Sequence, residues 1–529
     1  MNTLLQSITR PLRRMKLIPV MMLGLSAAIA ISGCSSTPGA STAPQESAAP
    51  KKLTLLHHFK SGSLDPHNDW TPVRAGVTET LMRLDAELRI QPWLAEKWES
   101  VDERTWRFTL REGVTFHDGT KLDAAAAKAS LERGAAVSKA IASSLKIASM
   151  EASGQTLTIV TTEPHPGLLS ELVNPYSSII SVEAEKKAGR EAFNLAPVGT
   201  GPFKVKSFKP NIEVQLERND TYWDGKAKLQ EVTYRFNEDG NVRALALQAK
   251  EADIATQLPA ETVDTIKGNS ALEVHSVPSL RVHFVLYNQK KPHLQDIRVR
   301  KALDLLLNRE SVAKDVMLGH ATPANGPFNT RLPFASQEKV QPLDIEKAKQ
   351  LLVEAGYTPG TDGKLAKDGK PLTLELITYK ARPELPLIAQ LLQSDAAKAG
   401  VTIQIKTVEN ADVHLRENKE WDLATYSNLT APRGDGAYFL NTAMMPGGSL
   451  NAGSINSEKL SEIVGRLNRA SAPDERIGLT REATAVIHEE TPHSYAVFPN
   501  LIVGTNKRVV DWKPGAEEYY IITKQMDVK

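Results

Sequence analysis

The stretch from Ala196 to Gly225 limits what this 529-residue chain can fold into more than any other part of it. Within six positions it has four residues that interrupt regular structure: Pro197, Gly199, Gly201 and Pro202. A helix or a central strand does not tolerate that density, so we expect the chain to pass here from one lobe into another. Two alternating runs follow on either side of a polar turn: Phe203, Val205 and Ser207, then Ile212, Val214 and Leu216. This pattern predicts a β-hairpin with one buried face.

The sequence Gly199-Thr200-Gly201 does not fit a phosphate-binding loop. A third glycine is missing, and Pro202 follows directly. The next element is a predicted strand, whereas a dinucleotide site requires a helix N-terminus at this point. We therefore assign the glycines to the turn and not to a nucleotide.

Two motifs in this stretch resemble the signature of the family 5 solute-binding proteins of ABC importers, which include oligopeptide, dipeptide and nickel binders. The first is the turn from Pro197 to Pro202, and the second is Arg218-Asn219 followed by Tyr222-Trp223. The resemblance implies an α/β, two-lobed periplasmic-binding-protein fold (class II, Venus-flytrap) with an extra subdomain in the first lobe. The nickel or metal-chelate branch of the family is favoured.

Residues 1–33 read as a secretory signal peptide. Four basic residues precede an apolar run from Leu17 to Ile31, and Ser32-Gly33-Cys34 then forms a lipoprotein cleavage box. Residues 34–50, rich in Ser, Thr, Ala and Pro, are expected to form a flexible linker that is lipid-anchored through Cys34. We therefore expect an exported protein, lipid-anchored to the cell membrane and facing the exterior or the periplasm. The sequence leaves open which membrane of a two-membrane cell holds the anchor.

Charge and cysteine content exclude several classes of partner. The leader contains four basic and no acidic residues, so the 64 basic and 62 acidic residues of the full chain become 60 and 62 after its removal. A mature chain of this charge does not imply nucleic acid as a partner. The single cysteine excludes an intrachain disulfide and a metal-thiolate cluster. We expect a monomer whose partners are a small-molecule ligand, ABC permease subunits and, through the lipid, the membrane.

The expected domain order follows the resemblance. Residues 51–85 begin lobe I, residues 86–195 form its small subdomain, and residues 196–285 continue lobe I. Lobe II is expected to span residues 286–500, and residues 501–529 to return to lobe I. In lobe II, a predicted strand at 372–379, a helix at 385–399 and a strand at 401–408 favour a partly parallel sheet.

Two local predictions concern helices. The segment from Val73 to Leu84 is a plausible helix in the first lobe. Asp296 is predicted to cap another helix. The basic residues beside it are expected to form a solvated face, with a permease contact as the alternative: Lys290, Lys291, Arg298, Arg300 and Lys301.

No catalytic set emerges from the sequence, so we do not expect an enzyme. His488 and His493 are five positions apart, where a zincin helix needs four. The chain has no Gly-x-Ser-x-Gly elbow, and its one cysteine is at the lipid anchor.

The loop from Ser427 to Tyr438 is the best candidate for ligand binding. It follows a predicted strand at 421–426, and α/β folds place binding residues in such loops. Arg433 lies in it between a proline and a glycine, and the planar guanidinium of arginine suits a carboxylate. The predicted ligand-binding residues are Arg433, Arg74, Trp70, Tyr426 and Asn428.

The resemblance to nickel binders is incomplete around this site. Ala431-Pro432 matches them, but Leu429-Thr430 stands where they have a tryptophan, and the segment from Asn174 to Tyr176 lacks the arginine that some of them carry. Arg74 and Arg433 could supply the positive charge instead.

Histidines are weak candidates for direct metal ligands. His58 and His67 lie near each other in the sequence, and imidazole suits nickel. His57 and His58 are adjacent on a predicted strand, so we expect them to point to opposite faces and at most one to reach a site. Whether any protein side chain coordinates metal stays unknown at this level.

The function that follows is an extracytoplasmic solute-binding lipoprotein that captures a nickel or other metal chelate and delivers it to an ABC importer. The alternative is a di- or oligopeptide-binding receptor of an ABC importer. No catalytic cofactor is expected, and a bound nickel or other divalent metal would arrive within its chelate. The sequence does not identify the metal, the chelator or the peptide.

Overall fold

The structure is a computed structural model that describes residues 50–418 and 420–529. The predicted leader, Cys34 and the linker up to residue 49 lie outside the described residues. No helix of residues 50–418 or 420–529 is long and apolar enough to cross a bilayer.

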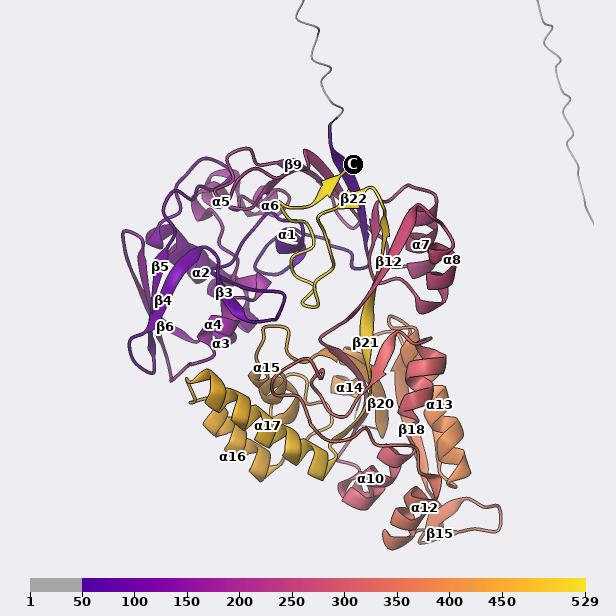
Figure 1. The fold of residues 1–529 in the computed structure, drawn as a ribbon. Helices are drawn as coiled ribbons and strands as arrows, with labels where there is room; N and C mark the ends of the chain where they lie inside the picture. Colours follow the sequence, from indigo (N-terminus) through magenta and orange to yellow (C-terminus); the bar gives the residue numbers. More distant parts are fainter. Residues whose placement is uncertain (1–49, 419) are drawn as a thin grey trace, which may run out of the picture. The chain divides into compact units, whose positions relative to one another are not determined.

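One large mixed sheet is built from two halves joined by a long strand, β21 (His493–Asn506). The strand order is β19-β18-β20-β13-β21-β11-β1-β10-β9-β8, and β12 and β14 also pair with β21. Figure 1 shows β21 running from one half into the other. We call the half around β1 the first lobe and the half around β18 the second lobe. The α/β, two-lobed architecture predicted from the sequence is confirmed.

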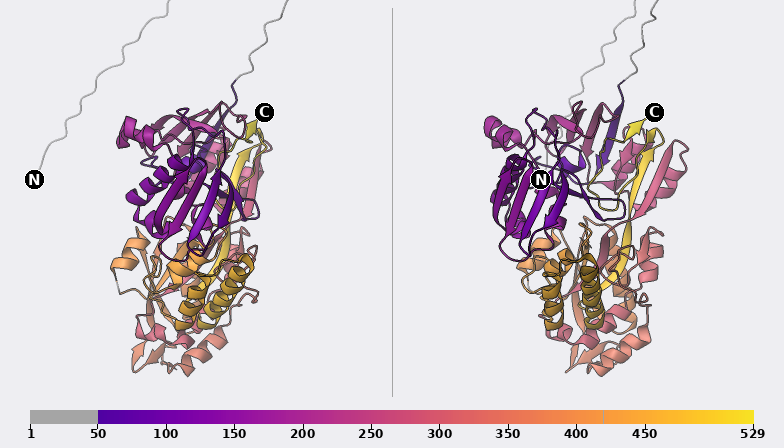
Figure 2. Two further views of the ribbon diagram at one scale, coloured as in Figure 1. Left: turned by 90° about the vertical axis from the view of Figure 1, so that its left-hand side faces the viewer. Right: turned by 60° about the vertical axis from the view of Figure 1, so that its left-hand side comes forward.

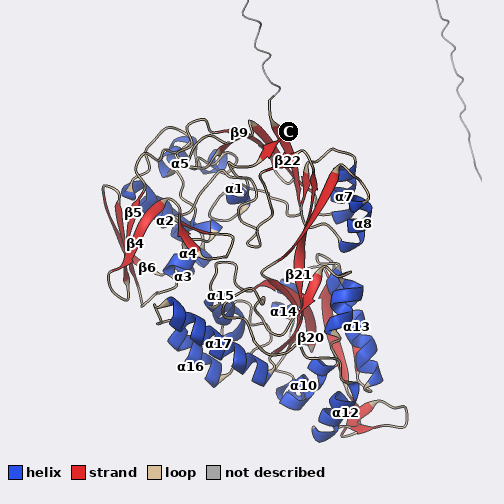
Figure 3. Ribbon diagram, in the orientation of Figure 1, coloured by secondary structure: helices blue, strands red, loops and turns tan. Residues whose placement is uncertain are grey.

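The first lobe contains both parallel and antiparallel strands. Strand β1 is parallel to β10 and β11, and β9 is antiparallel to both β10 and β8. Its strands are β1 (Lys52–His57), β8 (Phe203–Lys209), β9 (Glu213–Arg218), β10 (Glu231–Phe236), β11 (Ile254–Ala255) and β12 (Leu272–Pro278). Helices α7 (Gly240–Gln248) and α8 (Val263–Lys267) lie against β11, β12 and β21, as Figure 3 shows.

The predicted hairpin is formed by β8 and β9. Val214 and Leu216 are buried as expected, but Ile212 is 59% exposed because it belongs to the turn and not to the strand. The hairpin therefore buries one face over β9, and the tip of the loop lies in solvent.

The first-lobe subdomain is a four-stranded antiparallel sheet covered by helices. The strand order is β4-β5-β7-β6, and α2 packs on β6 and β7. Figure 2 shows these strands side by side. The elements are β4 (Ala95–Ser100), β5 (Thr105–Leu110), α2 (Ala124–Val137), α3 (Lys139–Leu145), β6 (Ile147–Ser153), β7 (Thr156–Thr161), α4 (Leu168–Glu171), α5 (Val182–Ala188) and α6 (Arg190–Phe193).

The second lobe contains the parallel strands that the strand-helix-strand order predicted. Strand β18 is parallel to both β19 and β20, whereas β13 is antiparallel to β20 and β21. Its strands are β13 (Arg281–Tyr287), β14 (Ala321–Pro323), β18 (Thr373–Tyr379), β19 (Thr402–Val408) and β20 (Leu423–Leu429), and a separate small sheet has β15 (Thr358–Pro359), β16 (Leu365–Lys367) and β17 (Lys370–Pro371). The helices are α9 (Pro292–Gln295), α10 (Ile297–Leu305), α11 (Arg309–Ser311), α12 (Ile345–Glu354), α13 (Glu384–Lys398), α14 (Ala411–Glu417), α15 (Ala437–Phe439), α16 (Glu458–Leu467) and α17 (Pro473–Glu490).

The chain crosses between the lobes at two neighbouring places. Residues 279–280 connect β12 to β13, and β21 passes beside them. The Ser279 amide and hydroxyl both donate to the Pro499 carbonyl, at 3.3 and 2.6 Å. The first crossing thus lies before β13, whereas the expected boundary at residue 285 falls inside that strand.

The helix expected from Val73 to Leu84 is wrong. Helix α1 (Thr71–Arg74) has only four residues, and β2 (Met82–Leu84) pairs with β3 (Ile90–Pro92). Gly76, at φ 67°, ends the helical conformation, and the following segment is extended. This segment lies against the Pro197–Pro202 turn, where the Gly201 amide donates to the Val77 carbonyl at 3.0 Å.

The glycines of the turn are explained by this contact. A Cβ atom on Gly199 would lie 2.2 Å from the Val77 carbonyl oxygen, and one on Gly201 would lie 2.2 Å from the Gly76 carbonyl oxygen. Any side chain at either position would collide with backbone, so close approach of two segments requires glycine here.

The two signature motifs meet at a buried carboxylate, Glu79. Thr200 Oγ1 and Trp223 Nε1 donate to Glu79 Oε2 at 2.7 and 3.0 Å, and Tyr222 Oη donates to Oε1 at 2.5 Å. Burial raises the pKa of Glu79 to about 7, and the three hydrogen bonds oppose this shift. The motif residues therefore act in the packing of the first lobe.

Arg300 corrects the expectation of a solvated basic face. Asp296 caps α10 as predicted, but the Arg300 side chain is buried and donates to the carbonyls of Glu490 and Thr491, at 2.8 and 3.1 Å. These carbonyls lie at the C-terminal end of α17, where a cation is favourable. Arg300 therefore joins two helices, and we do not count it among residues available to a permease.

Candidate functional site

The candidate site lies between the lobes, at the carboxyl ends of the parallel strands of the second lobe. Strands β18, β19 and β20 are parallel and end at the same edge of the sheet. The segments that leave them carry Arg382, Asp412 and Arg433. Ligands of α/β proteins bind at such an edge. The sequence prediction that the loop after β20 belongs to the site rests on this rule.

The first lobe contributes an arginine packed among aromatic rings. The guanidinium carbon of Arg74 lies 5.1 Å from the Trp70 ring, which also meets Tyr519 edge-on at 5.2 Å and Tyr176 at 5.7 Å. Arg74 Nε donates to the Glu518 carbonyl at 3.1 Å. Helix α1 positions both Trp70 and Arg74, and Tyr176 stands close to where the resemblance implied an arginine. The structure thus brings Trp70 and Arg74 together.

Arg433 connects the two lobes through an ion pair. Its Nη1 donates to Glu171 Oε2, at the end of α4 in the first-lobe subdomain, and its guanidinium carbon lies 4.9 Å from the Tyr438 ring. Gly434 follows at φ 71°, and a Cβ there would lie 2.3 Å from the Leu88 carbonyl oxygen. The loop that carries Arg433 therefore packs directly on the first lobe, and its guanidinium already has a protein carboxylate as partner.

Tyr426 lies on β20, as predicted, and Asn428, which was expected in the loop that follows, also lies on this strand. Tyr426 Oη donates to Asp412 Oδ1, and its ring meets Tyr379 at 6.2 Å. Asn428 is opposite Val282 of β13, and its buried Nδ2 has no hydrogen-bond partner among the residues that the structure describes. Asn428 thus has a donor available for a ligand, whereas the Tyr426 hydroxyl is already paired.

Sequence reasoning missed a group of ionisable side chains beside these residues, of which His283 is fully buried. His283 Nε2 and Glu384 Oε1 are 2.9 Å apart. Burial lowers the pKa of His283, so its ring is neutral at pH 7. Burial also acts to raise the pKa of Glu384, but the hydrogen bond with His283 and the charge of Arg382 outweigh it, and the pKa of Glu384 lies below its ordinary value.

Arg281 belongs to the same group and is less well paired. It begins β13, and its Nη1 makes only a 3.4 Å contact with Ser427 Oγ. Burial and the nearby charge of Arg382 lower the pKa of Arg281 to about 10. One signal was available in the sequence: Arg281 lies in the segment before residue 286 that was expected to lead from the first lobe into the second.

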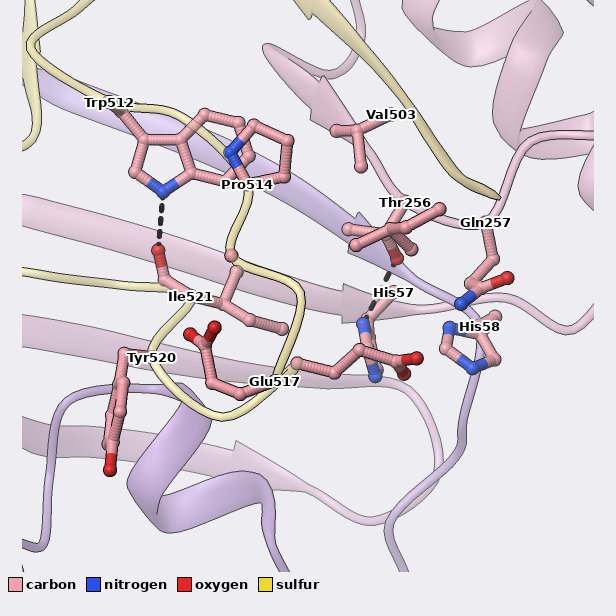
Figure 4. A pocket seen from close by; sticks show the side chains of 13 residues that line it. His57, His58, Thr256, Gln257, Val503, Trp512, Pro514, Glu517, Tyr520 and Ile521 are labelled. Atoms are coloured by element: carbon pink, nitrogen blue, oxygen red, sulfur yellow. Dashed lines mark hydrogen bonds between the residues drawn. The ribbon is translucent and has the colours of Figure 1, made fainter. Parts of the chain in front are cut away.

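A small cavity lies on the first-lobe side, between the end of β1 and the loop of residues 512–521. Its volume is about 20 Å³, and His57, His58, Gln257, Trp512 and Glu518 are among its lining residues. Figure 4 shows His57 and His58 side by side in it, with the hydrogen bond from His57 to Thr256.

The prediction that His57 and His58 point to opposite faces is therefore wrong. Strand β1 ends at His57, so the alternation of side chains stops there, and the two ring centroids are 4.4 Å apart. Burial lowers the pKa of both rings well below 6.5. Both rings are neutral at pH 7, and neither nitrogen of His58 has a partner in the described part of the chain.

Both ring nitrogens of His67 contact protein groups, so neither is available to a metal. Its Nε2 contacts the Ser178 carbonyl at 2.9 Å, and its Nδ1 contacts Arg133 Nη1 at 2.9 Å. Burial lowers the pKa of His67 to about 4. Within residues 50–418 and 420–529, no three His, Cys, Asp or Glu side chains are arranged to hold a metal ion.

Comparison with known proteins gives consistent matches over most of the chain. The model of bacterial extracellular solute-binding proteins, family 5 Middle, matches residues 89–450. The nickel-binding protein NikA of Staphylococcus aureus (strain NCTC 8325 / PS 47) is 33% identical over 497 residues, which cover 94% of this chain and 96% of that protein.

Two solved structures are similar along their whole length. The nickel ABC transporter protein from Bacillus halodurans is 44% identical, with a TM-score of 0.78, and the match covers 90% of this chain and 100% of that one. NikA from Staphylococcus aureus in complex with Ni(L-His)2 is 33% identical, with a TM-score of 0.79 and the same coverage.

Proposed function

The chain belongs to family 5 of the bacterial extracellular solute-binding proteins, and from this premise we propose that it captures a nickel chelate, or a related metal chelate, for an ABC importer. The proposal has the protein bind and release its cargo without chemical change, and it names no catalytic residue. The mature protein would be held at the outer side of the membrane by lipid on Cys34 and would deliver its cargo to the permease subunits.

The observation that carries the proposal is the number of arginines around the site between the lobes. Arg74 comes from the first lobe, and Arg281, Arg382 and Arg433 come from the second. Carboxylate groups of a chelate are natural partners for guanidinium groups in such a partly dehydrated site. No set of three protein ligands for a metal occurs in the described residues, so the chelator would supply most of the metal's ligands.

The residues proposed to contact the cargo are the five that the sequence predicted. Trp70 offers a ring face and a buried Nε1 that lacks a partner among the described residues. Asn428 offers its free amide donor, and Arg74 and Arg433 offer positive charge. Arg433 would exchange Glu171 for a ligand carboxylate. Tyr426 would contribute the face of its ring, since its hydroxyl pairs with Asp412.

The test is direct measurement of metal binding by the intact purified protein. Calorimetry and elemental analysis would compare Ni²⁺ alone with Ni²⁺ plus excess L-histidine, the chelate named in the complex of the similar NikA. We expect one nickel per chain with the chelator and no tight binding of free Ni²⁺. Binding of di- or oligopeptides at micromolar affinity, with no chelate bound, would overturn the proposal in favour of a peptide receptor.

A further inference from the structure

The Arg74 side chain is held through one of its nitrogens, and the other two are open. Arg74 Nε donates to the Glu518 carbonyl at 3.1 Å. The terminal nitrogens, Nη1 and Nη2, have no hydrogen-bond or ion-pair partner within residues 50–418 and 420–529. Because Nε is occupied, the edge formed by Nη1 and Nη2 is the one left to bind a carboxylate with two parallel hydrogen bonds.

Two aromatic rings lie beside the same guanidinium group. Its carbon atom is 5.1 Å from the centre of the Trp70 ring and 5.7 Å from the centre of the Phe59 ring. Both distances are within the range of cation–π attraction. Phe59 follows the end of β1 by two residues, and its ring contacts the His58 ring with centroids 3.9 Å apart. Phe59 is nevertheless 46% exposed, so its ring restrains the guanidinium without being part of a core.

The carbonyl that holds Arg74 belongs to a residue in an unfavourable backbone conformation. The φ of Glu518 is 61°, in the left-handed region that non-glycine residues rarely adopt. Contacts on the C-terminal side of Glu518 maintain this shape. The Ile522 amide donates to the Arg74 carbonyl at 2.8 Å, and Trp512 Nε1 donates to the Ile521 carbonyl at 2.8 Å. Strain that is maintained by surrounding contacts is typical of binding sites.

The same C-terminal loop also contacts Trp70. Tyr519 follows Glu518, is 1% exposed, and its ring meets the Trp70 ring edge-on at 5.2 Å. The loop thus contacts both first-lobe residues that are proposed to bind the cargo. A change in its backbone conformation would therefore move the guanidinium of Arg74.

We propose that Glu518 and Phe59 are positioning residues for cargo binding: the Glu518 carbonyl and the Phe59 ring orient Arg74 so that its Nη1–Nη2 edge is presented to a carboxylate of the cargo. The inference rests on the proposed function and adds two residues to it. An arginine that is already oriented loses little side-chain freedom when a ligand binds, so this arrangement raises the affinity. The role of Glu518 belongs to its backbone carbonyl and therefore depends on the φ of residue 518.

The test changes the backbone preference at residue 518 and the ring face at residue 59. Glu518→Val disfavours a positive φ because valine is β-branched, whereas Glu518→Asn accepts the left-handed conformation. Phe59→Leu removes the ring face, and Phe59→Tyr keeps it. Arg74→Met removes the donors and the charge of Arg74. The matched control is Asp368→Val, which places the same strain at φ 51° in the exposed turn between β16 and β17.

Calorimetry on the intact purified protein, with Ni²⁺ and excess L-histidine, measures the affinity. Glu518→Val should weaken binding about 10-fold or more, and Phe59→Leu about threefold. Glu518→Asn and Phe59→Tyr should keep most of the affinity, and Asp368→Val should bind as the wild type does. In the Arg74→Met background, neither Glu518→Val nor Phe59→Leu should cause a further loss, because both act through Arg74.

A second measurement needs no chelate. In protein that contains isotopically labelled arginine, the NMR signal of the Arg74 Nε–H group is assigned by its absence in Arg74→Met. Its exchange with water should be slow in the wild type and in Glu518→Asn, and about 10-fold faster or more in Glu518→Val, because the hydrogen bond to the carbonyl is lost. Unchanged exchange in Glu518→Val would overturn the positioning role of Glu518.

The outcomes separate the positioning role from the proposed function. Equal affinities for Glu518→Val and Glu518→Asn, or a full further loss from Glu518→Val in the Arg74→Met background, would overturn the role of Glu518 and leave the proposed function standing. Wild-type affinity in Phe59→Leu would overturn the role of Phe59. A wild-type protein that binds no metal chelate would overturn the proposed function, and the inference with it. If thermal melting shows that Glu518→Val does not fold, Glu518→Ala replaces it, with a smaller loss expected because alanine is not β-branched.

Discussion

Glu79 should make the folded protein less stable as the pH rises. Its carboxyl is fully buried, and its three hydrogen-bond donors, Thr200, Tyr222 and Trp223, carry no formal charge. Because no cation offsets the cost of burial, the pKa of Glu79 rises from 4.5 to about 7 in the folded state.

The sign and size of the effect follow from proton linkage. Between pH 4.5 and 7 the folded state keeps a proton on Glu79 that the unfolded chain has lost, so the free energy of unfolding falls as the pH rises through this window. The stabilisation is fully present below pH 4.5. With these two pKa values, the loss between pH 5 and pH 8 is about 2.5 kcal/mol.

Glu79→Gln isolates this contribution. The amide is neutral at every pH and similar in shape, and the hydroxyls of Thr200 and Tyr222 can reorient to accept from its nitrogen. Urea unfolding followed by tryptophan fluorescence at pH 5 and pH 8 gives the free energy for wild type and variant. We expect the wild type to lose about 2.5 kcal/mol more than the variant over this interval.

The control is Glu482→Gln, which changes a carboxylate on the exposed side of α17. It should keep the wild-type difference between pH 5 and pH 8. Parallel pH profiles for wild type and Glu79→Gln would refute the reasoning, because they would mean that the carboxyl of Glu79 has the same proton affinity in the folded and unfolded states.

Three further predictions concern the anchor, the closure of the lobes and Arg433. Cys34→Ser should move the protein from the membrane fraction to the soluble fraction without changing its affinity for nickel with L-histidine; unchanged membrane association on fractionation would contradict the lipid anchor. Saturating chelate should reduce the radius of gyration in solution scattering and slow hydrogen exchange near Ser279, because the lobes are joined by few crossing segments that act as a hinge; identical scattering and exchange with and without chelate would exclude closure. Arg433→Ala should weaken chelate binding by about 2 to 5 kcal/mol in calorimetry, whereas Glu171→Gln should strengthen it, because the Glu171 carboxylate no longer competes for the guanidinium. A loss of affinity in both variants would mean that this ion pair holds the lobes together.

Local features of the fold could be predicted because their causes lie within a few residues. Asp123 accepts a hydrogen bond from the Ala126 amide, and Asp296 accepts one from the Arg298 amide, so each helix start is visible in the sequence. The alternation in β8 and β9 predicts the hairpin for the same reason. The expected helix from Val73 to Leu84 does not form because a segment that is distant in the sequence, the Pro197–Pro202 turn, binds the backbone after Gly76.

The candidate site was only partly predictable. The rule that ligands bind at the carboxyl ends of parallel strands predicted the loop of Arg433. Trp70 and Arg74, at the start of the first lobe, were also predicted from the sequence. Neither spacing nor composition could predict that Arg433 pairs with Glu171, which is 262 residues away in the chain. The side-chain direction of His58 was not predictable either. It differs from the expected one because β1 ends one residue before His58.

The sequence by itself determined the family, the two-lobed α/β fold and the residues of the signature, because these depend on local patterns and on a motif of fixed spacing. Only the tertiary structure decided what the signature does and which charges face each other. Thr200, Tyr222 and Trp223 meet Glu79 across 121 to 144 residues, and the paired charges of Arg433 and Glu171 come from different lobes. The physical reason is that electrostatic and hydrogen-bond energies depend on distance in space and on burial, and both quantities arise only when the two lobes are folded and packed together.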